Sequence, residues 1–600
     1  MFLKCTRRNK DGKTHHYWSV VENRRLSSGR IAQRQVLYLG EINDSQKAAW
    51  RKSIHVFDED KNRLRQVALF PEAVVPPNTA TAVGIRLNEL QLKRPRQWGA
   101  CWLADVLWRQ LGLDAFWEAR LPPSRKGTPW ASVLQTLVTY RLIDPGSEWR
   151  LHRQWFVQSA MADLLDADFA LAEKDTLYRC LDKVLAHRDD LINFLRTRWG
   201  ELFGITFDVL LYDLTSTYFE SDTARGEKDL RQYGYSRDKR GDCRQVVIGL
   251  IVTPDGFPLS YEVLAGNTAD SATLGDLLTR IETRYGKANR IWCMDRGVPT
   301  EATLAQMRAM GASYVVGTPK GRLTKLEGDY LTQPWSQVRE GLMVKQLPQE
   351  GETYVLALST QRVHKERAMR KQRLKRYVAR LKALQAQRPK RDALLMKMGA
   401  AKQAAGRAAS LITITVPGVD ETVSHDTFRF ALDRKKLRAV RRREGRYLLR
   451  TNMNGYDPAV LWTFYVQLTE VEQAFKELKN DLAIRPLYHQ LEHRIEAHIF
   501  VAFLSYSLQV TLKHQLRQRA PGLTPRAAIE TFKTMQMVDI QIPTTDGRTL
   551  LLSRYTQPEP EHCLLLDALR LRLPAQPPPK ITASCVSPVV RRDRGVVKTF

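Results

Sequence analysis

Three carboxylates occupy positions at which the chain could bind catalytic cations. Asp213 follows the apolar run ITFDVLLY and Asp295 follows NRIWCM, so each is expected at the end of a buried strand. Glu472 lies in YVQLTEVEQAFKELK, which has the period of an amphipathic helix. Two neighbouring carboxylates repel each other unless a cation lies between them. Such oxygen ligands suit two Mg²⁺ or Mn²⁺ ions, which can activate water or a 3′-hydroxyl to attack a phosphodiester.

Each of these acids also has an ordinary structural explanation. A strand-end aspartate more often caps a turn or a helix, and a glutamate on a basic helix usually forms a surface ion pair. The order of the surrounding elements favours the metal site, because the first and fourth strands of a β-β-β-α-β-α-β order lie side by side. Asp213 and Asp295 should therefore meet at one edge of the sheet. The strands are expected at 205–213, 243–253, 257–264, 289–297 and 313–318, and the helices at 270–286 and 300–311.

The positive charge of the chain is concentrated in two segments. The 600 residues include 94 Lys and Arg against 64 Asp and Glu, a formal net charge of +30. This excess favours nucleic acid as the partner over a merely basic surface. Residues 362–407 carry +14 and residues 432–450 carry +7, together +21 of the +30. The first segment is predicted to form a helical hairpin broken at Pro389, with an apolar stripe on its first helix at Leu374, Tyr377, Leu381 and Leu384.

Several classes of protein are disfavoured. The seven cysteines include no C-x-x-C pair, which argues against a zinc ribbon, a redox motif and a disulfide scaffold. The first residues, MFLKCTRRNK, lack the apolar core of a signal peptide. The longest apolar run, at 497–512, is too short and too polar to span a bilayer and is predicted to be a buried helix. We therefore expect a cytoplasmic protein with no membrane partner.

The length requires several domains. The predicted fold class is α/β, a mixed-sheet core with a large insertion before the Glu472 helix. The tryptophans of 97–203 are typical of a packed helical core, and its arginines are equally compatible with DNA binding. The expected segments are a β-rich module (1–75), a helical DNA-binding domain (97–203), the first part of the core (204–319), a basic insertion of strands and a helical hairpin (320–455), the second part of the core (456–515), and a helical region with a basic tail (516–600).

The ordered set of segments over about 205–515 resembles the DDE transposases of bacterial insertion sequences, which have an RNase H-like core. The likeness includes YDLTSTYFE, GYSRDKR, LAGNTADSATL, CMDRG and RPLYH. The chain is similar to the subgroup marked by Tyr-x2-Arg-x3-Glu-x6-Lys, and the corresponding positions are Tyr465, Leu468, Glu472 and Lys479.

The resemblance implies that Asp213, Asp295 and Glu472 bind the catalytic metals. It also implies that Tyr465 and Lys479 contact DNA phosphate near the cut. Both lie seven residues from Glu472, about two helical turns, so the three are expected on one helix face.

The sequence departs from the subgroup pattern at one position, since Leu468 stands where the motif has arginine. Leucine cannot bind a phosphate, so Lys476 or Arg485 is a candidate for that contact. Glu470 and Glu477 are rival acids, but neither has the motif spacing to both Tyr465 and Lys479.

Three further residues lie near these acids in the sequence. Arg296 directly follows Asp295 and could bind phosphate or pair with the carboxylates. His489 and His498 are expected to be core histidines or residues that contact and support the metal ligands.

The resemblance implies a transposase that performs Mg²⁺-dependent DNA cleavage and strand transfer at inverted-repeat ends. Its partners would be double-stranded transposon ends and target DNA, bound by a homodimer at the bacterial nucleoid. One alternative function is that of a non-catalytic DNA-binding relative. Such a protein would be expected to lack one of the three carboxylates, yet all three are present. The other alternative is a structure-directed nuclease, and the large helical segment before the core argues against it.

Overall fold

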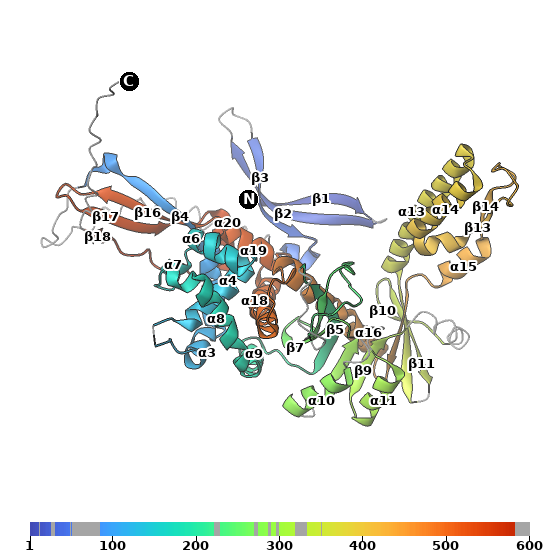
Figure 1. Cartoon of the computed structure of the whole chain (residues 1–600), viewed down its shortest axis with the longest axis horizontal. Coiled ribbons are helices and arrows are strands. Elements are labelled where there is room, and N and C mark those ends of the chain that lie inside the picture. Colours follow the sequence, from blue (N-terminus) through green and yellow to red (C-terminus); the bar gives the residue numbers. More distant parts are fainter. Residues whose placement is uncertain are drawn as a thin grey trace, which may run out of the picture. The chain divides into compact units, whose positions relative to one another are not determined.

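A computed structural model of the chain is shown in Figure 1. It describes residues 1–10, 13–25, 31–48, 50, 85–125, 127–220, 229–268, 274–285, 290–295, 299–318, 333–349 and 351–582. These residues form two compact units. One contains the described residues of 1–4, 18–199 and 477–582, and the other contains those of 5–17 and 200–476.

A nine-stranded mixed sheet organises the second unit, and its strand order is β10-β11-β12-β15-β9-β8-β5-β6-β7. The predicted β-β-β-α-β-α-β order is confirmed by β5 (Val209–Tyr218), β6 (Gln245–Val252), β7 (Pro258–Ala265), α10 (Leu274–Tyr285), β8 (Ile291–Met294), α11 (Glu301–Ala309) and β9 (Ser313–Gly317). Strands β5, β8 and β9 are parallel neighbours, while β6 and β7 run antiparallel beside β5. The fold is therefore the expected mixed α/β core.

One face of this sheet carries the hydrophobic core. Alternate residues of β5, such as Tyr212, pack with Trp292 and Met294 of β8. Residues of α10 and α11 complete this cluster, among them Leu278 and Met307. Because successive residues of a strand point to opposite faces, the residues that follow Tyr212 and Met294 belong to the other face.

The insertion contributes to the same sheet, which the sequence did not indicate. After β9 the chain forms β10 (Ser336–Arg339), β11 (Leu342–Gln349) and β12 (Glu352–Ser359). It returns through β15 (Arg446–Thr451), which pairs with β12 on one side and β9 on the other. The insertion is therefore joined to the core by continuous strand pairing.

The predicted helical hairpin is confirmed. It consists of α13 (Thr360–Gln387) and α14 (Arg391–Ala405), with Pro389 in the turn between them (Figure 1). Tyr377, Leu381 and Leu384 of the predicted stripe are buried, and Leu374 packs against them. The second basic segment is divided between α15 (Arg434–Arg442), which has no buried residue, and strand β15.

The first unit is mainly helical, as expected for 97–203. Its helices include α2 (Gly99–Gln110), α3 (Leu113–Arg120), α4 (Trp130–Ile143), α8 (Lys174–Val184) and α9 (Arg188–Phe203). Helix α18 (Glu492–Arg519) packs against α2, α4 and α8. By length and composition α18 could cross a membrane, but 94% of its most apolar window is buried inside the protein. The prediction of a buried helix is confirmed.

Strands are present near both ends of the described chain. The expected β-rich module appears as the three-stranded sheet β1 (Phe2–Lys10), β2 (Lys13–Arg25) and β3 (Ile31–Gly40), while residues 51–75 lie outside the described part.

The helical assignment of 516–600 is partly wrong. Helices α19 (Pro525–Phe532) and α20 (Pro560–Leu569) are present, but β16 (Gln536–Pro543) and β17 (Thr549–Tyr555) form a hairpin between them. This hairpin belongs to a four-stranded sheet with β4 (Gln91–Gln97) and β18 (Lys580–Thr582). The basic end of the tail lies outside the described residues.

Candidate active site

Asp213 lies on β5, and Asp295 directly follows the neighbouring strand β8. The parallel pairing of β5 with β8 places Tyr212 opposite Met294, and the residue after each of these two is an aspartate. Both aspartates belong to the face opposite the Tyr212 and Met294 core, and both line one cavity. The predicted meeting of the two segments is therefore confirmed.

The predicted position of Asp213 at the end of its strand is wrong. Strand β5 continues to Tyr218, because β6 pairs with it as far as the Tyr218–Gln245 position. Strand β8, in contrast, ends at Met294. The two aspartates therefore meet beside the end of β8 but beside the middle of β5. Asp213 is consequently fixed within a strand, whereas Asp295 directly follows the last residue of its strand.

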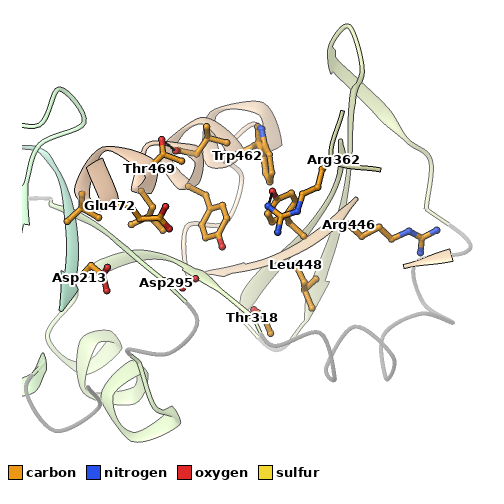
Figure 2. Close-up of a pocket in the computed structure, with 14 residues that line it drawn as sticks. Asp213, Asp295, Thr318, Arg362, Arg446, Leu448, Trp462, Thr469 and Glu472 are labelled. Atoms are coloured by element: carbon orange, nitrogen blue, oxygen red, sulfur yellow. Dashed lines mark hydrogen bonds between the residues drawn. The ribbon is translucent and has the colours of Figure 1, made fainter. Parts of the chain in front are cut away.

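Glu472 reaches the same cavity from a helix that covers this face. Helix α17 (Leu468–Lys476) packs against β5 and β6, and its buried residues include Val471, Ala474 and Phe475. Glu472 is exposed and lines the cavity with the two aspartates. In Figure 2 the three carboxylates gather at one side of the cavity.

The expectation that Tyr465, Glu472 and Lys479 share one helix is wrong. Tyr465 belongs to α16 (Pro458–Val466), which begins after Asp457, whose side chain accepts a hydrogen bond from the Ala459 N–H. A break at Gln467 separates α16 from α17, and Lys479 lies in the π-helical turn η7 (Glu477–Asp481). Tyr465 lines the cavity with Glu472, but Lys479 does not.

The cavity has a volume of about 340 Å³ and is open to solvent. Neither Asp295 nor Glu472 forms an ion pair within the part of the chain that the structure describes. Accessible carboxylate oxygens without a paired cation are a donor set that fits hard divalent ions. The residues lining it are Asp213, Asp295, Thr318, Arg362, Arg446, Tyr447, Leu448, Trp462, Tyr465, Val466, Leu468, Thr469, Val471 and Glu472 (Figure 2).

An aromatic wall continues the cavity away from the carboxylates. The ring of Tyr447, on β15, lies 5.1 Å from that of Trp462 and 6.3 Å from that of Tyr465, measured between centroids. The Arg362 guanidinium lies 4.3 Å from the centre of the Tyr447 ring. Burial raises the pKa of Tyr447, so its hydroxyl remains protonated at neutral pH.

Sequence reasoning missed Arg362, Tyr447 and Trp462 as cavity residues. Arg362 precedes Glu472 by 110 residues and lies in a segment interpreted only as a basic hairpin. The pairing of β12 with β15 brings it there, and the sequence pattern contains no signal for that pairing.

Two other proposed phosphate-binding residues, Lys476 and Arg485, lie outside the cavity. Lys476 is exposed in the last turn of α17, and Arg485 donates to Asn480 Oδ1 over 3.4 Å; neither lines the cavity. Arg296 lies outside the described residues. Leu468, at the position of the motif arginine, does line the cavity and is 8% exposed.

The rival acids do not reach the carboxylate cluster. Glu477 is buried and forms an ion pair with Lys513 Nζ over 3.2 Å. Glu470 is half-buried on α17 and does not line the cavity. Glu472 is thus the acid of this helix that lies with Asp213 and Asp295.

His489 and His498 belong to a buried polar network, which confirms that they are core residues. His489 Nε2 lies 3.2 Å and His498 Nδ1 3.5 Å from Glu148 Oε1. Arg141 Nη2 lies 3.3 Å from His498 Nδ1, and Arg141 Nη1 donates to the Ala483 carbonyl oxygen. The hydrogen bonds of Glu148 with His489 and His498 hold its pKa well below its usual range despite its burial, whereas burial lowers the pKa of His498 to about 3.

Comparison with known families agrees with this arrangement. Residues 208–508 match the family model of the transposase DDE domain, and residues 3–63 match the N-terminal domain of IS1634 family transposases. The first match spans half of the chain, so the chain belongs to the DDE transposase family. It is a transposase of a bacterial insertion sequence, an enzyme whose family cleaves DNA and transfers strands, acts on DNA and generally uses divalent metal ions.

A solved structure is also similar to the chain. The cryo-EM structure of the piggyBac transposase synaptic complex with hairpin DNA is 9% identical, with a TM-score of 0.34, and the match covers 76% of this chain and 82% of that one. No curated protein matches the chain.

Proposed function

We propose that this transposase cleaves the inverted-repeat ends of its own element and joins them to target DNA at the Asp213, Asp295 and Glu472 cavity. The observation that carries the proposal is the convergence of three carboxylates from distant segments on one open cavity. These residues would hold two Mg²⁺ or Mn²⁺ ions. Such ions, when bound, activate the attacking oxygen and stabilise the leaving oxygen of a phosphodiester.

The protein's own part is to hold the three carboxylates rigidly. Asp213 lies in a strand paired on both sides, with β6 and β8 as its neighbours. Glu472 projects from α17, whose opposite side is buried against β5 and β6. Sites built on strands and helices keep ligand positions better than sites on loops. Asp295 directly follows Met294, the last residue of β8.

Phosphate binding around the cut is assigned to several residues. Tyr465 lines the cavity, so its hydroxyl can donate to a phosphate oxygen there. Lys479, Lys476 and Arg485 remain candidates for phosphates further from the cavity. Arg296, which directly follows Asp295 in the sequence, remains a candidate for binding a phosphate or for pairing with the carboxylates. Their roles rest on the family motif and on charge.

The basic insertion supplies a broader DNA-binding surface. Lys371, Arg373, Lys375 and Arg376 are all exposed on α13, and the basic residues of α15 are exposed as well. Contacts of this kind position the DNA without reading its sequence. End recognition is assigned to the N-terminal module and the helical 97–203 domain, in a homodimer that works at the bacterial nucleoid in the cytoplasm.

The proposal is tested by replacing each carboxylate without changing its size. Asp213→Asn, Asp295→Asn and Glu472→Gln should each abolish Mg²⁺-dependent cleavage of a duplex carrying the element's terminal repeat, while binding of that duplex survives. Glu470→Gln, on the same helix but outside the cavity, is the matched control and should cleave normally. A strand-resolved gel would report nicking, hairpin formation and strand transfer separately.

Two results would count against this function. Full cleavage by any of the three carboxylate variants would remove the site assignment. Cleavage by the wild-type protein without any strand transfer to target DNA would favour the structure-directed nuclease.

A further inference from the structure

One arginine of the insertion lies in the carboxylate cavity. Strand β12 ends at Ser359, and α13 begins at the next residue, so Arg362 is in the first turn of that helix. The Ser359 hydroxyl caps the helix by accepting a hydrogen bond from the Arg362 N–H. Because β12 pairs with β15 at the Ala357–Tyr447 position, the start of α13 is held beside the aromatic wall.

The guanidinium of Arg362 is oriented by two contacts. Its Nε donates to Glu366 Oε1 over 3.0 Å, and its Nη1 donates to the hydroxyl of Tyr447, over whose ring it lies. Glu366 is itself fixed, since its Oε2 accepts a hydrogen bond from the Gly445 N–H over 3.0 Å. The charged group is therefore held in place before any DNA binds.

The same guanidinium is available to a ligand. The Arg362 side chain is 46% exposed, and its Nη2 has no partner within the described part of the chain. Figure 2 shows Arg362 on the side of the cavity away from Asp213 and Glu472, whereas Arg446 points outward. A planar guanidinium binds phosphate through paired hydrogen bonds, which makes arginine suited to a fixed phosphate position.

A cation at this place would compensate for a change in the glutamate helix. Leu468 occupies the motif position at which an arginine is expected, and its side chain forms part of the cavity wall. Lys476 and Arg485 do not line this cavity, but Arg362 does. The positive charge missing from α17 is thus present on the opposite wall, carried by the insertion.

We propose that Arg362 binds a DNA phosphate adjacent to the scissile one and so replaces the arginine that position 468 lacks. This assignment rests on the proposed function of the carboxylate cavity. It gives the insertion a role inside the cleavage site, in addition to the general attraction of its basic surface.

The test combines protein variants with DNA in which single phosphates are neutralised. Arg362→Ala should slow cleavage of the terminal-repeat duplex by roughly 10- to 100-fold, the usual effect of losing a charged hydrogen bond. One uncharged methylphosphonate next to the cut should slow the wild-type protein similarly and leave Arg362→Ala unaffected. The same position should weaken wild-type binding measured in EDTA.

The matched control is Arg339→Ala. Arg339 is exposed on β10, an edge strand of the insertion, and lies outside both the cavity and the two basic segments. Its loss removes the same charge and should leave the rate unchanged. Arg362→Ala and Arg339→Ala behaving alike would overturn the assignment.

Two further outcomes decide the proposal. The fold-reductions in cleavage rate caused by Arg362→Ala and by a methylphosphonate could multiply at every phosphate tested. In that case Arg362 contacts none of those phosphates and the proposal fails. Because wild-type scanning needs no variant, the absence of any sensitive phosphate beside the cut would overturn it even if Arg362→Ala misfolds. Leu468→Arg added to a folded Arg362→Ala protein should recover at least about tenfold in rate, and no recovery would overturn the compensation.

Failure of the wider function is distinguishable from failure of this inference. If Asp213→Asn still cleaves, the cavity itself is wrong. If Asp213→Asn is inactive while Arg362→Ala matches the control, only the assignment of Arg362 falls.

Discussion

Gly445 is the residue on which the placement of α13 against β15 depends most directly. Its φ is +69°, and a Cβ built there would lie 2.3 Å from Val363 Cγ2 and 2.7 Å from the Ser359 carbonyl oxygen. The Ser359 N–H donates to the Gly445 carbonyl oxygen over 3.0 Å, so the backbones are already in contact. Gly445→Ala should therefore force the start of α13, with Arg362, away from the cavity.

The loss of folding stability expected for Gly445→Ala has two parts. A left-handed backbone conformation costs an alanine about 1–2 kcal/mol. Overpacking adds about 1–3 kcal/mol where the neighbours cannot yield, and one of them here is a backbone oxygen. Gly455 is the matched control, because its φ is +82° and no atom lies within 4 Å of the added Cβ. Gly455→Ala should lose only the first part.

Urea denaturation of both variants measures the difference. Gly445→Ala should be less stable than Gly455→Ala by about 1–3 kcal/mol, or roughly 2–5 °C in Tm. Val363→Ala, added to Gly445→Ala, should restore only part of this loss, since the Ser359 oxygen remains. Equal stability of the two glycine variants would refute the close-contact argument.

The pKa of His498 falls from 6.5 to about 3 on folding, so below pH 6.5 the unfolded chain takes up a proton that the folded chain does not. The free energy of unfolding should therefore decline as the pH drops below 6.5, by about 2 kcal/mol at pH 5. The lowered pKa of Glu148 acts in the same direction below about pH 4.5, and His498→Asn should flatten the decline in urea titrations between pH 7 and 5. Replacing Lys371, Arg373, Lys375 and Arg376 by Gln should reduce the slope of log affinity against log salt by roughly 0.9 for each side chain that contacts a phosphate, up to about 3.6. An unchanged slope would show that these four side chains of α13 do not bind DNA.

The strand order around the aspartates was predictable because it depends on local patterns. Apolar runs that end in aspartate and helices with clear periodicity define β5, β8 and their connections. The position of Asp213 within β5 was not predictable, because the strand is lengthened by pairing with β6 rather than by its own composition. Tertiary pairing likewise places the insertion strands in the sheet.

The division of the glutamate helix was missed for a related reason. The sequence from 465 to 479 has an unbroken amphipathic pattern, and neither proline nor glycine marks the break at Gln467 or the π-helical turn at Lys479. The hairpin of β16 and β17, by contrast, had a readable signal. The Asp546–Gly547 pair stands between two alternating runs, which is typical of a tight turn.

The place of β15 between β12 and β9 has a consequence for engineering this transposase. Excising 320–455 as a module would remove an interior strand together with three strands beyond it, and the exposed edge of β9 would favour aggregation. The turn of the α13–α14 hairpin near Pro389 lies outside every strand of the sheet. A fluorescent or affinity domain inserted there would report on the folded enzyme without dividing its sheet.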